Sequence, residues 1–350
     1  MNRSFTVGDF VVSRDAADCF VIAEIGSNHQ GDIKIAKKLI DEAAAAGVQA
    51  VKFQKRSNQT LFTKEMFNRA YDNENSFGPT YGLHRLHLEF GETEYPELIS
   101  YAKERGLVLF STPFDLESVE FCEQLNMPAY KVGSGDLRTY PLLEAVGKSG
   151  KPVFMSTGAC NLVDVRPAYE YLRSFTDKIC LLQCTSLYPA EPADLNLRVI
   201  STYLREFPEA VIGYSGHDNG IVMPVVAYML GARVVEKHFT LNRAMKGTDH
   251  KFSLEPQGLR KMVRDLNRAK VALGTGEKVC LEAEVEARNK LGKSLVLRRA
   301  LEKGTVLTRD MLTFKAPGGG VPPSQIAAVC GRRLQIDLDE DSVLKWEHLV

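Results

Sequence analysis

Two lysines stand inside apolar stretches of this 350-residue sequence, Lys52 in the run AVKFQ and Lys131 in AYKVGS. A lysine is rare in such surroundings unless an acidic side chain or a ligand partners it. Hydroxyl side chains follow other apolar stretches, at Ser134, Ser156, Ser186 and Ser215. Ammonium groups and hydroxyls satisfy anionic oxygens, so these residues predict a phosphate or carboxylate site. The alternative is two ordinary surface lysines, and the lack of a P-loop argues against a nucleoside triphosphate.

Two histidines end later apolar stretches, His217 in GYSGHD and His238 in VVEKH. If these stretches are neighbouring strands, which lie under about 5 Å apart, both imidazoles can reach one ion. Two histidines, with substrate and water in the other positions, suit an open divalent-metal site. The alternative is two histidines that only make hydrogen bonds. Carboxylates that could bind sugar hydroxyls or act as a general base beside them are Glu24, Asp136, Glu236 and Asp249.

A repeating strand-and-helix unit is predicted to position these side chains. In residues 20–55 an apolar run ends in Glu24, helical spacing covers 33–46 up to Gly47, and a second strand ends with Lys52 and Gln54. The alternation resumes after residue 94 and gives eight such units by residue 273. Eight units over about 250 residues are typical of a (β/α)8 TIM barrel. The alternative is a doubly wound open sheet, but no GxGxxG follows the first strand.

Every predicted strand ends in side chains that can donate, accept or ligate. They are Glu24, Lys52, Gln54, Thr112, Lys131, Ser134, Asp136, Ser156, Thr157, Thr185, Ser186, Tyr188, Ser215, His217, Glu236 and His238. The carboxyl ends of the strands of a closed barrel surround one opening, where ligands bind. The sequence therefore predicts that these groups converge on one mouth.

The chain is expected to divide into a barrel domain, 1–273, a linker, 274–292, and a small domain, 293–350. The linker is rich in Glu, whereas the tail has short β-like runs and the cluster APGGGVPP. A domain of about 60 residues is near the lower limit of independent stability, so we expect it to lean on something else. Residues 56–94 are too long for an ordinary connection and are predicted to form a lid or binding loop.

The composition excludes several classes of protein. Lys plus Arg and Asp plus Glu both number 44, whereas a nucleic-acid-binding protein would show a basic excess. No apolar run reaches membrane-spanning length, and the first residues lack the apolar segment of a signal peptide. The seven cysteines include no CxxC pair, which indicates free thiols in a reducing compartment. We therefore expect a cytoplasmic protein without nucleic-acid or membrane partners.

Motifs in the same order along nearly the whole chain resemble those of the sialic acid synthase family. They include FVIAEIGSNHQGD, KFQK, TYGLHRLHLEF, KVGSGD, LQCTSLYP, GYSGHD, VVEKHFT, KGTDHKFSLEP and, in the tail, LGKSLV. The resemblance implies condensation of phosphoenolpyruvate with N-acetylmannosamine, or its 6-phosphate, to give N-acetylneuraminate, or its 9-phosphate, and phosphate. It also implies a barrel followed by a small antifreeze-like (SAF) β-rich domain. In the implied domain-swapped homodimer, each small domain covers the partner's barrel mouth.

The resemblance also implies roles for individual residues. Phosphoenolpyruvate would be bound by Lys52, Thr112, Lys131, Ser134, Ser156, Ser186 and Ser215. The sugar would meet Glu24, Gln54, Tyr188, Asp249 and, in the tail, Lys315. Glu24, Lys131 and Asp136 would take part in catalysis, with Asp136 guiding the attacking water. A divalent metal on His217 and His238 would polarise the sugar aldehyde; Mn²⁺ is expected ahead of Mg²⁺ or Co²⁺.

Two positions depart from the family pattern. Many bacterial members carry Glu where Asp136 stands, and many have Arg-Pro-Gly where this chain has Ala316-Pro317-Gly318. Either Lys315 replaces that arginine or other residues hold the sugar. The identity of the sugar therefore stays open, and legionaminic acid or the deaminated sugar are the alternative products. Two rival classes are a class I aldolase with Lys131 or Lys52 as Schiff-base nucleophile and a carbohydrate-binding protein whose tail carries the function.

Overall fold

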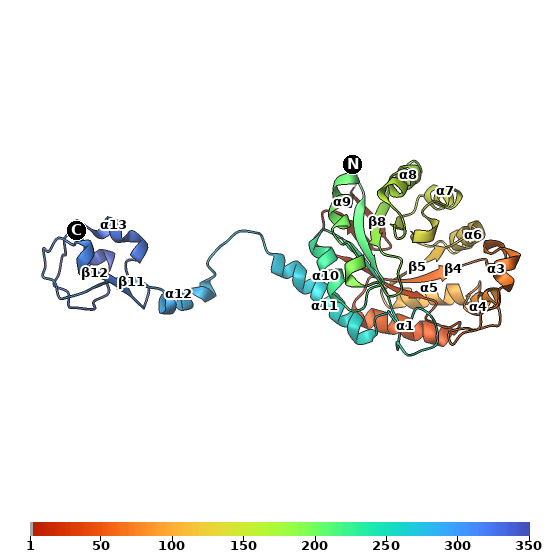
Figure 1. Cartoon of the computed structure of the whole chain (residues 1–350), viewed down its shortest axis with the longest axis horizontal. Coiled ribbons are helices and arrows are strands. Elements are labelled where there is room, and N and C mark those ends of the chain that lie inside the picture. Colours follow the sequence, from red (N-terminus) through yellow and green to blue (C-terminus); the bar gives the residue numbers. More distant parts are fainter. Residues whose placement is uncertain (1–2) are drawn as a thin grey trace. The chain divides into compact units, whose positions relative to one another are not determined.

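The structure of the chain is a computed structural model, and it describes residues 3–350. It divides the chain into two compact units, the first running to Gly274 and the second from Thr275 to Val350 (Figure 1).

Eight parallel strands close into a barrel in the first unit, in the order β10-β3-β4-β5-β6-β7-β8-β9. Their bounds are β3 (Phe20–Gly26), β4 (Ala50–Lys55), β5 (Val108–Pro113), β6 (Tyr130–Val132), β7 (Val153–Ser156), β8 (Ile179–Cys184), β9 (Val211–Gly216) and β10 (Val234–His238). The helices around them are α1 (Ile33–Ala46), α5 (Glu94–Glu104), α6 (Leu116–Gln124), α7 (Tyr140–Lys148), α8 (Leu162–Arg173), α9 (Val199–Glu206), α10 (Val222–Met229) and α11 (Pro256–Leu273). The predicted TIM barrel is therefore confirmed, and the open sheet is excluded.

Local sequence signals explain how the first unit of the barrel forms. The side chain of Asp32 accepts a hydrogen bond from Lys34 N (2.7 Å) and caps the start of α1. Gly47 ends the helix in the left-handed conformation, with φ of 81°, which a glycine adopts without a steric cost. The helix buries Leu39 and Ile40 against the barrel. The chain then returns along β4, which places Lys52 beside Glu24 in the β3–β4 register.

A hairpin of β1 (Ser4–Val7) and β2 (Phe10–Ser13) precedes the barrel. Its Phe5 meets Phe154 edge to face, with ring centroids 5.9 Å apart, and Phe154 also stacks on Phe20 and Phe110. All four rings are buried, so aromatic side chains fill this end of the barrel.

The segment after β4 forms three short helices, α2 (Asn58–Leu61), α3 (Lys64–Asn68) and α4 (Tyr81–His87). Asn75 of this segment accepts a hydrogen bond from Gly247 N (3.0 Å), in the loop after β10. The predicted long loop therefore contacts a second loop at the carboxyl end of the barrel.

The second unit has its own small core, which includes Leu295, Leu297, Leu312 and Leu344. Its elements are α12 (Val285–Leu291), an antiparallel pair of β11 (Ser294–Leu297) and β12 (Leu312–Lys315), and α13 (Ile326–Val329). Helix α12 lies within the expected linker, yet Gly318 N donates to Asn289 O (2.6 Å), so the helix packs on the small unit. Among residues 3–350, no helix is long and apolar enough to span a membrane.

Candidate active site

A cavity of about 350 Å³ opens at the carboxyl ends of the barrel strands, and we call it the mouth cavity. Each of the eight strands contributes to its lining, through Glu24, Lys52, Gln54, Thr112, Lys131, Ser156, Cys184, Ser215, Glu236 and His238. The loops that follow the strands add Ser134, Ser186, Tyr188 and His217. The structure thus brings most of the predicted site residues together at one opening.

Two ammonium groups and two carboxylates lie buried at the base of the mouth cavity. Lys52 Nζ is 2.6 Å from Glu24 Oε2 and 3.8 Å from Glu236 Oε2. Lys131 Nζ is 3.6 Å from Glu236 Oε1, so Glu236 bridges both lysines. A buried charge is costly unless an opposite charge pairs it, and every charge of this cluster has such a partner.

Hydroxyl groups add hydrogen bonds to this charged cluster, although Glu24 Oε2 and Glu236 Oε2 accept none from residues 3–350. Lys52 Nζ donates to Thr112 Oγ1 (2.8 Å), and Lys131 Nζ donates to Ser156 Oγ (2.6 Å). Ser215 Oγ donates to Glu236 Oε1 (3.0 Å), its partner in the adjacent strand register. An anion bound here would meet two cations and several hydroxyl donors in a water-poor environment, where such interactions are strong.

The two carboxylates have very different acidities. Burial raises the pKa of Glu24 to about 7, against the opposing effect of Lys52. Burial acts in the same direction on Glu236, but Lys131 and Lys52 outweigh it and hold the pKa of Glu236 at about 2. Glu24 therefore exchanges a proton near neutral pH, while Glu236 stays ionised, which is the pattern that separates an acid–base group from a fixed charge.

A tight loop after β7 places more donors beside the lysines. Gly158 N donates to Ser134 Oγ (2.9 Å). A Cβ added to Gly158 would lie 2.3 Å from Ser186 Oγ and 2.9 Å from Ser134 Oγ, so any larger residue would displace these hydroxyls. This close approach gathers two hydroxyls from different βα loops on one wall of the mouth cavity.

Two imidazoles lie side by side at the other wall. The ring centroids of His217 and His238 are 5.4 Å apart. His217 Nδ1 lies 2.8 Å from Thr185 O, which can only accept, so Nδ1 carries a proton and donates it to this oxygen. His238 Nδ1 is buried and has no hydrogen-bond partner among residues 3–350. It lies 3.9 Å from Asp249 Oδ2, and burial lowers the pKa of His238 to about 4.

These features fit a divalent ion. Metals bind the neutral imidazole, and a buried ring nitrogen without a partner is available for one. Within the described part of the chain, no group of three or more His, Cys, Asp or Glu side chains converges to enclose an ion. The protein would therefore supply two histidines, and substrate or water would fill the other positions, as in an open site.

A second buried ion pair holds the two histidine segments together. Lys237 Nζ donates to Asp218 Oδ1 (3.0 Å) and to the Asp218 backbone oxygen, and Tyr214 OH donates to the same carboxylate (2.6 Å). Both charged residues are 1% exposed. Because Asp218 follows His217 and Lys237 precedes His238, this pair fixes the spacing of the two imidazoles. We did not predict it from the sequence, where only the apolar neighbours of Lys237 hinted at a partner.

Other predicted site residues lie at the edge of the mouth cavity or outside it. Asp136 lies on the 3₁₀ turn η1 (Ser134–Asp136) but does not line the cavity, and burial raises its pKa. Asp249 approaches the cavity only through His238. Lys315 belongs to the second unit, where it forms an ion pair with Asp341.

The sequence analysis also missed the support of Glu24. Arg56 donates to Gln54 Oε1 (2.6 Å), and Gln54 Nε2 donates to Glu24 Oε1 (2.8 Å). Arg56 itself lies on the ring of Phe114, 3.9 Å from its centroid. The relay fixes the direction of the Gln54 amide, and its only sequence signal was the polar run of residues 54–56.

The fold and the mouth cavity together define a (β/α)8-barrel protein with two buried lysines and a pair of histidines at the carboxyl ends of its strands. The NeuB family model matches residues 39–278, and the SAF domain model matches residues 292–350. The chain belongs to the NeuB family and carries a C-terminal SAF domain.

Several proteins similar to this chain are named as synthases of sialic acids or of legionaminic acid. It is 43% identical, over 94% of its length and 92% of the relative's, to N-acetylneuraminate-9-phosphate synthase of Mus musculus. It is 36% identical, over 95% of its length and 94% of the relative's, to N,N'-diacetyllegionaminic acid synthase of Legionella pneumophila. The crystal structure of N-acetylneuraminic acid (sialic acid) synthetase from Leptospira borgpetersenii in complex with citrate has a TM-score of 0.70 at 32% identity and covers 83% of this chain and 98% of that one.

The acidity of Glu24 predicts a pH effect on stability. Its folded pKa of about 7 lies above the ordinary 4.5, so its contribution to stability is full below pH 4.5 and is lost as the pH rises through 7. Glu24→Gln should remove this loss, which is on the order of 3 kcal/mol. Urea unfolding between pH 5 and pH 8 measures it, with Glu120→Gln, an exposed change on α6, as the control. Parallel stability–pH curves for wild type and Glu24→Gln would show that Glu24 is not protonated at neutral pH.

Proposed function

We propose that this chain is a sialic acid synthase, which condenses phosphoenolpyruvate with N-acetylmannosamine, or its 6-phosphate, to N-acetylneuraminate, or its 9-phosphate, and phosphate. The observation that carries this is the mouth cavity, which two buried ammonium groups and two neighbouring imidazoles line together. Family membership and the name of the 43% identical mouse relative support the same reaction, with the phosphorylated sugar favoured.

The lysines and hydroxyls would bind phosphoenolpyruvate. Its phosphate and carboxylate need cations and donors, which Lys52, Lys131, Thr112 and Ser156 supply from four adjacent strands. Ser134, Ser186 and Ser215 would add further donors. Positive charge develops at C2 when C3 attacks the sugar aldehyde, and the permanently ionised Glu236 would stabilise that charge. Water then adds to C2, and phosphate leaves.

Glu24 and its neighbours would handle the sugar. The aldehyde oxygen becomes a hydroxyl when the carbon–carbon bond forms, so it needs a proton. Protonated Glu24 can give that proton because its pKa of about 7 leaves it partly protonated at neutral pH. Gln54, Tyr188 and Asp249 would bind the hydroxyls and amide of the sugar. Asp136 would guide the attacking water from the turn after Ser134.

A divalent ion, Mn²⁺ ahead of Mg²⁺ or Co²⁺, is our proposal for the cofactor. His217 and His238 would hold it, and it would act as a Lewis acid that polarises the aldehyde oxygen. The hydrogen bond from His217 to Thr185 O and the ion pair of Lys237 with Asp218 orient the two rings for this task.

A class I aldolase is the second candidate, and one observation favours it. Burial lowers the pKa of Lys131, and a Schiff-base nucleophile must be an unprotonated amine. This candidate predicts that borohydride traps pyruvate on Lys131 and that activity survives a chelator. The sialic acid synthase predicts neither.

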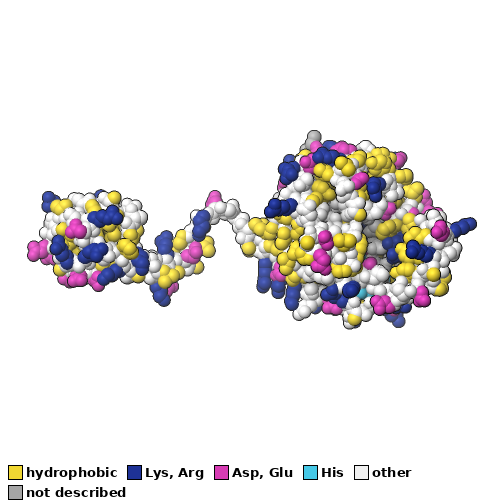
Figure 2. Space-filling view, viewed as in Figure 1, with side chains coloured by type: hydrophobic (Ala, Val, Ile, Leu, Met, Phe, Trp, Pro, Cys, Tyr) yellow, Lys and Arg dark blue, Asp and Glu magenta, His cyan; other side chains and the backbone are white. Residues whose placement is uncertain are grey.

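We also propose a homodimer, domain-swapped so that each small unit covers the partner's mouth and brings Lys315 to the sugar. Helix α10 supports a protein partner because it carries no charged residue and exposes Val222 (61%), Val226 (38%) and Met229 (53%). A surface helix that is apolar on all sides is typical of one that is covered. Figure 2 shows apolar side chains gathered on this side of the barrel. The free state of all seven cysteines supports a cytoplasmic location.

Phosphate release tests the proposed reaction. Phosphoenolpyruvate with N-acetylmannosamine 6-phosphate should release phosphate only when Mn²⁺ is present, and EDTA should stop the release. His217→Ala should lower the rate at least about a hundredfold while far-UV circular dichroism stays unchanged. His348→Ala, in the second unit, serves as the control. Full metal-dependent turnover by His217→Ala would reject the metal site. Phosphate release at the same rate in the absence of any sugar would reject the condensation.

The ion pair of Lys237 with Asp218 predicts a separable effect on metal binding. Lys237→Met leaves Asp218 buried and unpaired and should cost about 3–5 kcal/mol of stability. Lys237→Met with Asp218→Leu should recover much of that stability, yet bind Mn²⁺ about tenfold more weakly, as measured by electron paramagnetic resonance of free Mn²⁺. The exposed pair on α7, changed by Lys148→Met with Glu144→Leu, is the matched control. Wild-type Mn²⁺ affinity in the double variant would exclude the positioning role.

The apolar face of α10 predicts the oligomeric state. Val226→Glu with Met229→Glu should convert a dimer to a monomer in sedimentation velocity, because two buried unpaired carboxylates would oppose the contact. Val163→Glu, at a residue of α8 that is 76% exposed, should leave the dimer intact. A wild-type monomer would refute the dimer itself. A double variant that stays dimeric would place the interface elsewhere.

A further inference from the structure

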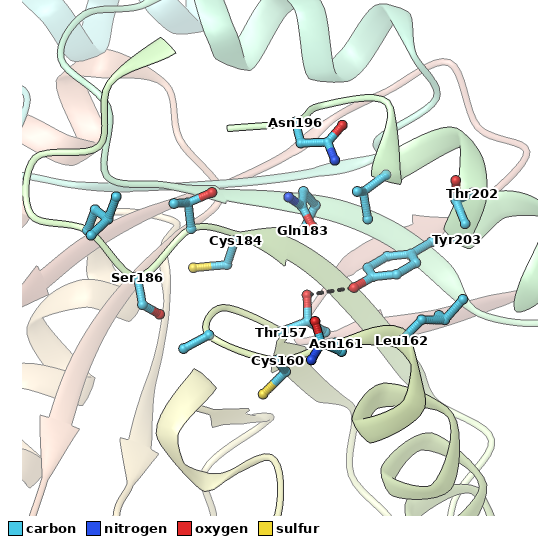
Figure 3. A pocket seen from close by; sticks show the side chains of 14 residues that line it. Thr157, Cys160, Asn161, Leu162, Gln183, Cys184, Ser186, Asn196, Thr202 and Tyr203 are labelled. Atoms are coloured by element: carbon cyan, nitrogen blue, oxygen red, sulfur yellow. Dashed lines mark hydrogen bonds between the residues drawn. The ribbon is translucent and has the colours of Figure 1, made fainter. Parts of the chain in front are cut away.

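A second cavity, of about 570 Å³, lies beside the mouth cavity and is larger than it. We call it the side cavity. It opens between the loop from β7 to α8 and the loop from β8 to α9, and Figure 3 shows its lining. Ala159, Cys184 and Ser186 line both cavities, so the two share a wall.

The side cavity differs chemically from the mouth cavity. None of its fourteen lining residues is an acid, a base or a histidine. It has three carboxamides, Asn161, Gln183 and Asn196, together with the hydroxyls of threonine, serine and tyrosine side chains. An anion would lose its hydration here without gaining a counter-charge, so the lining disfavours phosphates and carboxylates.

Part of the lining is fixed by internal hydrogen bonds. Tyr203 OH donates to Thr157 Oγ1 (3.0 Å), as Figure 3 shows. Thr157 in turn donates to Leu182 O (2.9 Å). Gln183, which is 7% exposed, donates its Nε2 to Leu195 O (3.0 Å). These bonds hold the polar groups in defined positions, as a pre-formed binding site requires.

Other polar groups of the lining are free to meet a ligand. Within residues 3–350, Gln183 Oε1 accepts no hydrogen bond, and the side chains of Asn196 and Thr202 make none. These groups are therefore available to donate to or accept from a bound molecule.

Backbone strain points to the same place. Five non-glycine residues among those described have positive φ, and two of them, Ala159 (55°) and Asn196 (42°), line the side cavity from opposite loops. Alanine lacks the polar side chain that helps Asn tolerate this conformation. Strained residues of this kind cluster at ligand clamps and active sites.

We propose that the side cavity binds a neutral, polyhydroxylated amide, of which an N-acylated aminosugar is the common example. Carboxamide side chains offer the donor and acceptor that an amide needs, and the hydroxyls match those of a sugar. Leu162, Leu187 and Val199 provide apolar surface for an acyl group. The cavity volume lies in the range of small-molecule sites. The inference goes beyond the proposed function because the side cavity lacks every charged group that the condensation needs.

Binding of N-acetylglucosamine to the full-length chain, followed by saturation-transfer NMR, tests this site. Thr202→Trp fills the side cavity and should weaken binding at least about tenfold. Lys131→Met alters only the mouth cavity and should leave the affinity within about twofold, because the two sites do not share Lys131. No binding by the wild type would refute the proposal. Loss of binding in Lys131→Met with retention in Thr202→Trp would place the sugar in the mouth instead.

A chemical measurement on the wild-type protein avoids any effect of Thr202→Trp on folding. Cys160 is half-buried and lines the side cavity alone, whereas Cys280 is exposed in the second unit. N-acetylglucosamine should slow alkylation of Cys160 by iodoacetamide several-fold and leave Cys280 unchanged, as measured by mass spectrometry. Inorganic phosphate should not protect Cys160. An unchanged rate at Cys160 in saturating sugar would refute the site, whatever the outcome of the phosphate-release assay.

Discussion

Glu236 is the residue on which the mouth of this barrel depends. Two lysines from β4 and β6 approach each other inside a protein, and their repulsion would be large in a medium of low dielectric. One carboxylate within 3.8 Å of both ammonium groups makes the arrangement tolerable. Glu24 supplies the second negative charge, but only when it is ionised. The net charge of the centre therefore depends on whether Glu24 carries a proton. The barrel can bury these four groups because each lies within ion-pair distance of an opposite charge.

Strand β10 shows how one short segment serves two purposes. Successive side chains of a strand point to opposite faces. Glu236 and His238 face the mouth cavity, whereas Lys237 between them points outward to Asp218. The inward pair carries chemical groups and the outward residue fixes their position. On β4, Lys52 and Gln54 also face the mouth cavity, and Arg56, just beyond the strand, holds the Gln54 amide by a hydrogen bond.

The sequence could predict the barrel because its signals are local. Helix spacing, the stop at Gly47 and apolar strands each act over a few residues, and eight repeats leave few alternatives. Lys52 and Lys131 were recognisable because each interrupts an apolar strand. The central place of Glu236 was not, since it depends on distances across the barrel that no local pattern encodes. The side cavity was missed for a similar reason, because its lining comes from two loops without periodicity and its polar residues resemble ordinary loop composition.

The aromatic plug at the opposite end of the barrel has a kinetic consequence. Four buried aromatic rings close the floor of the barrel, so the mouth cavity is open at one end only. They are Phe5, Phe20, Phe110 and Phe154. Two molecules bound one above the other in such a cavity can enter and leave only one after the other. In the proposed reaction, phosphoenolpyruvate bound by the lysines would therefore have to enter before the sugar and could leave only after it. The closed floor of the barrel thus favours ordered over random binding, without any movement of a loop.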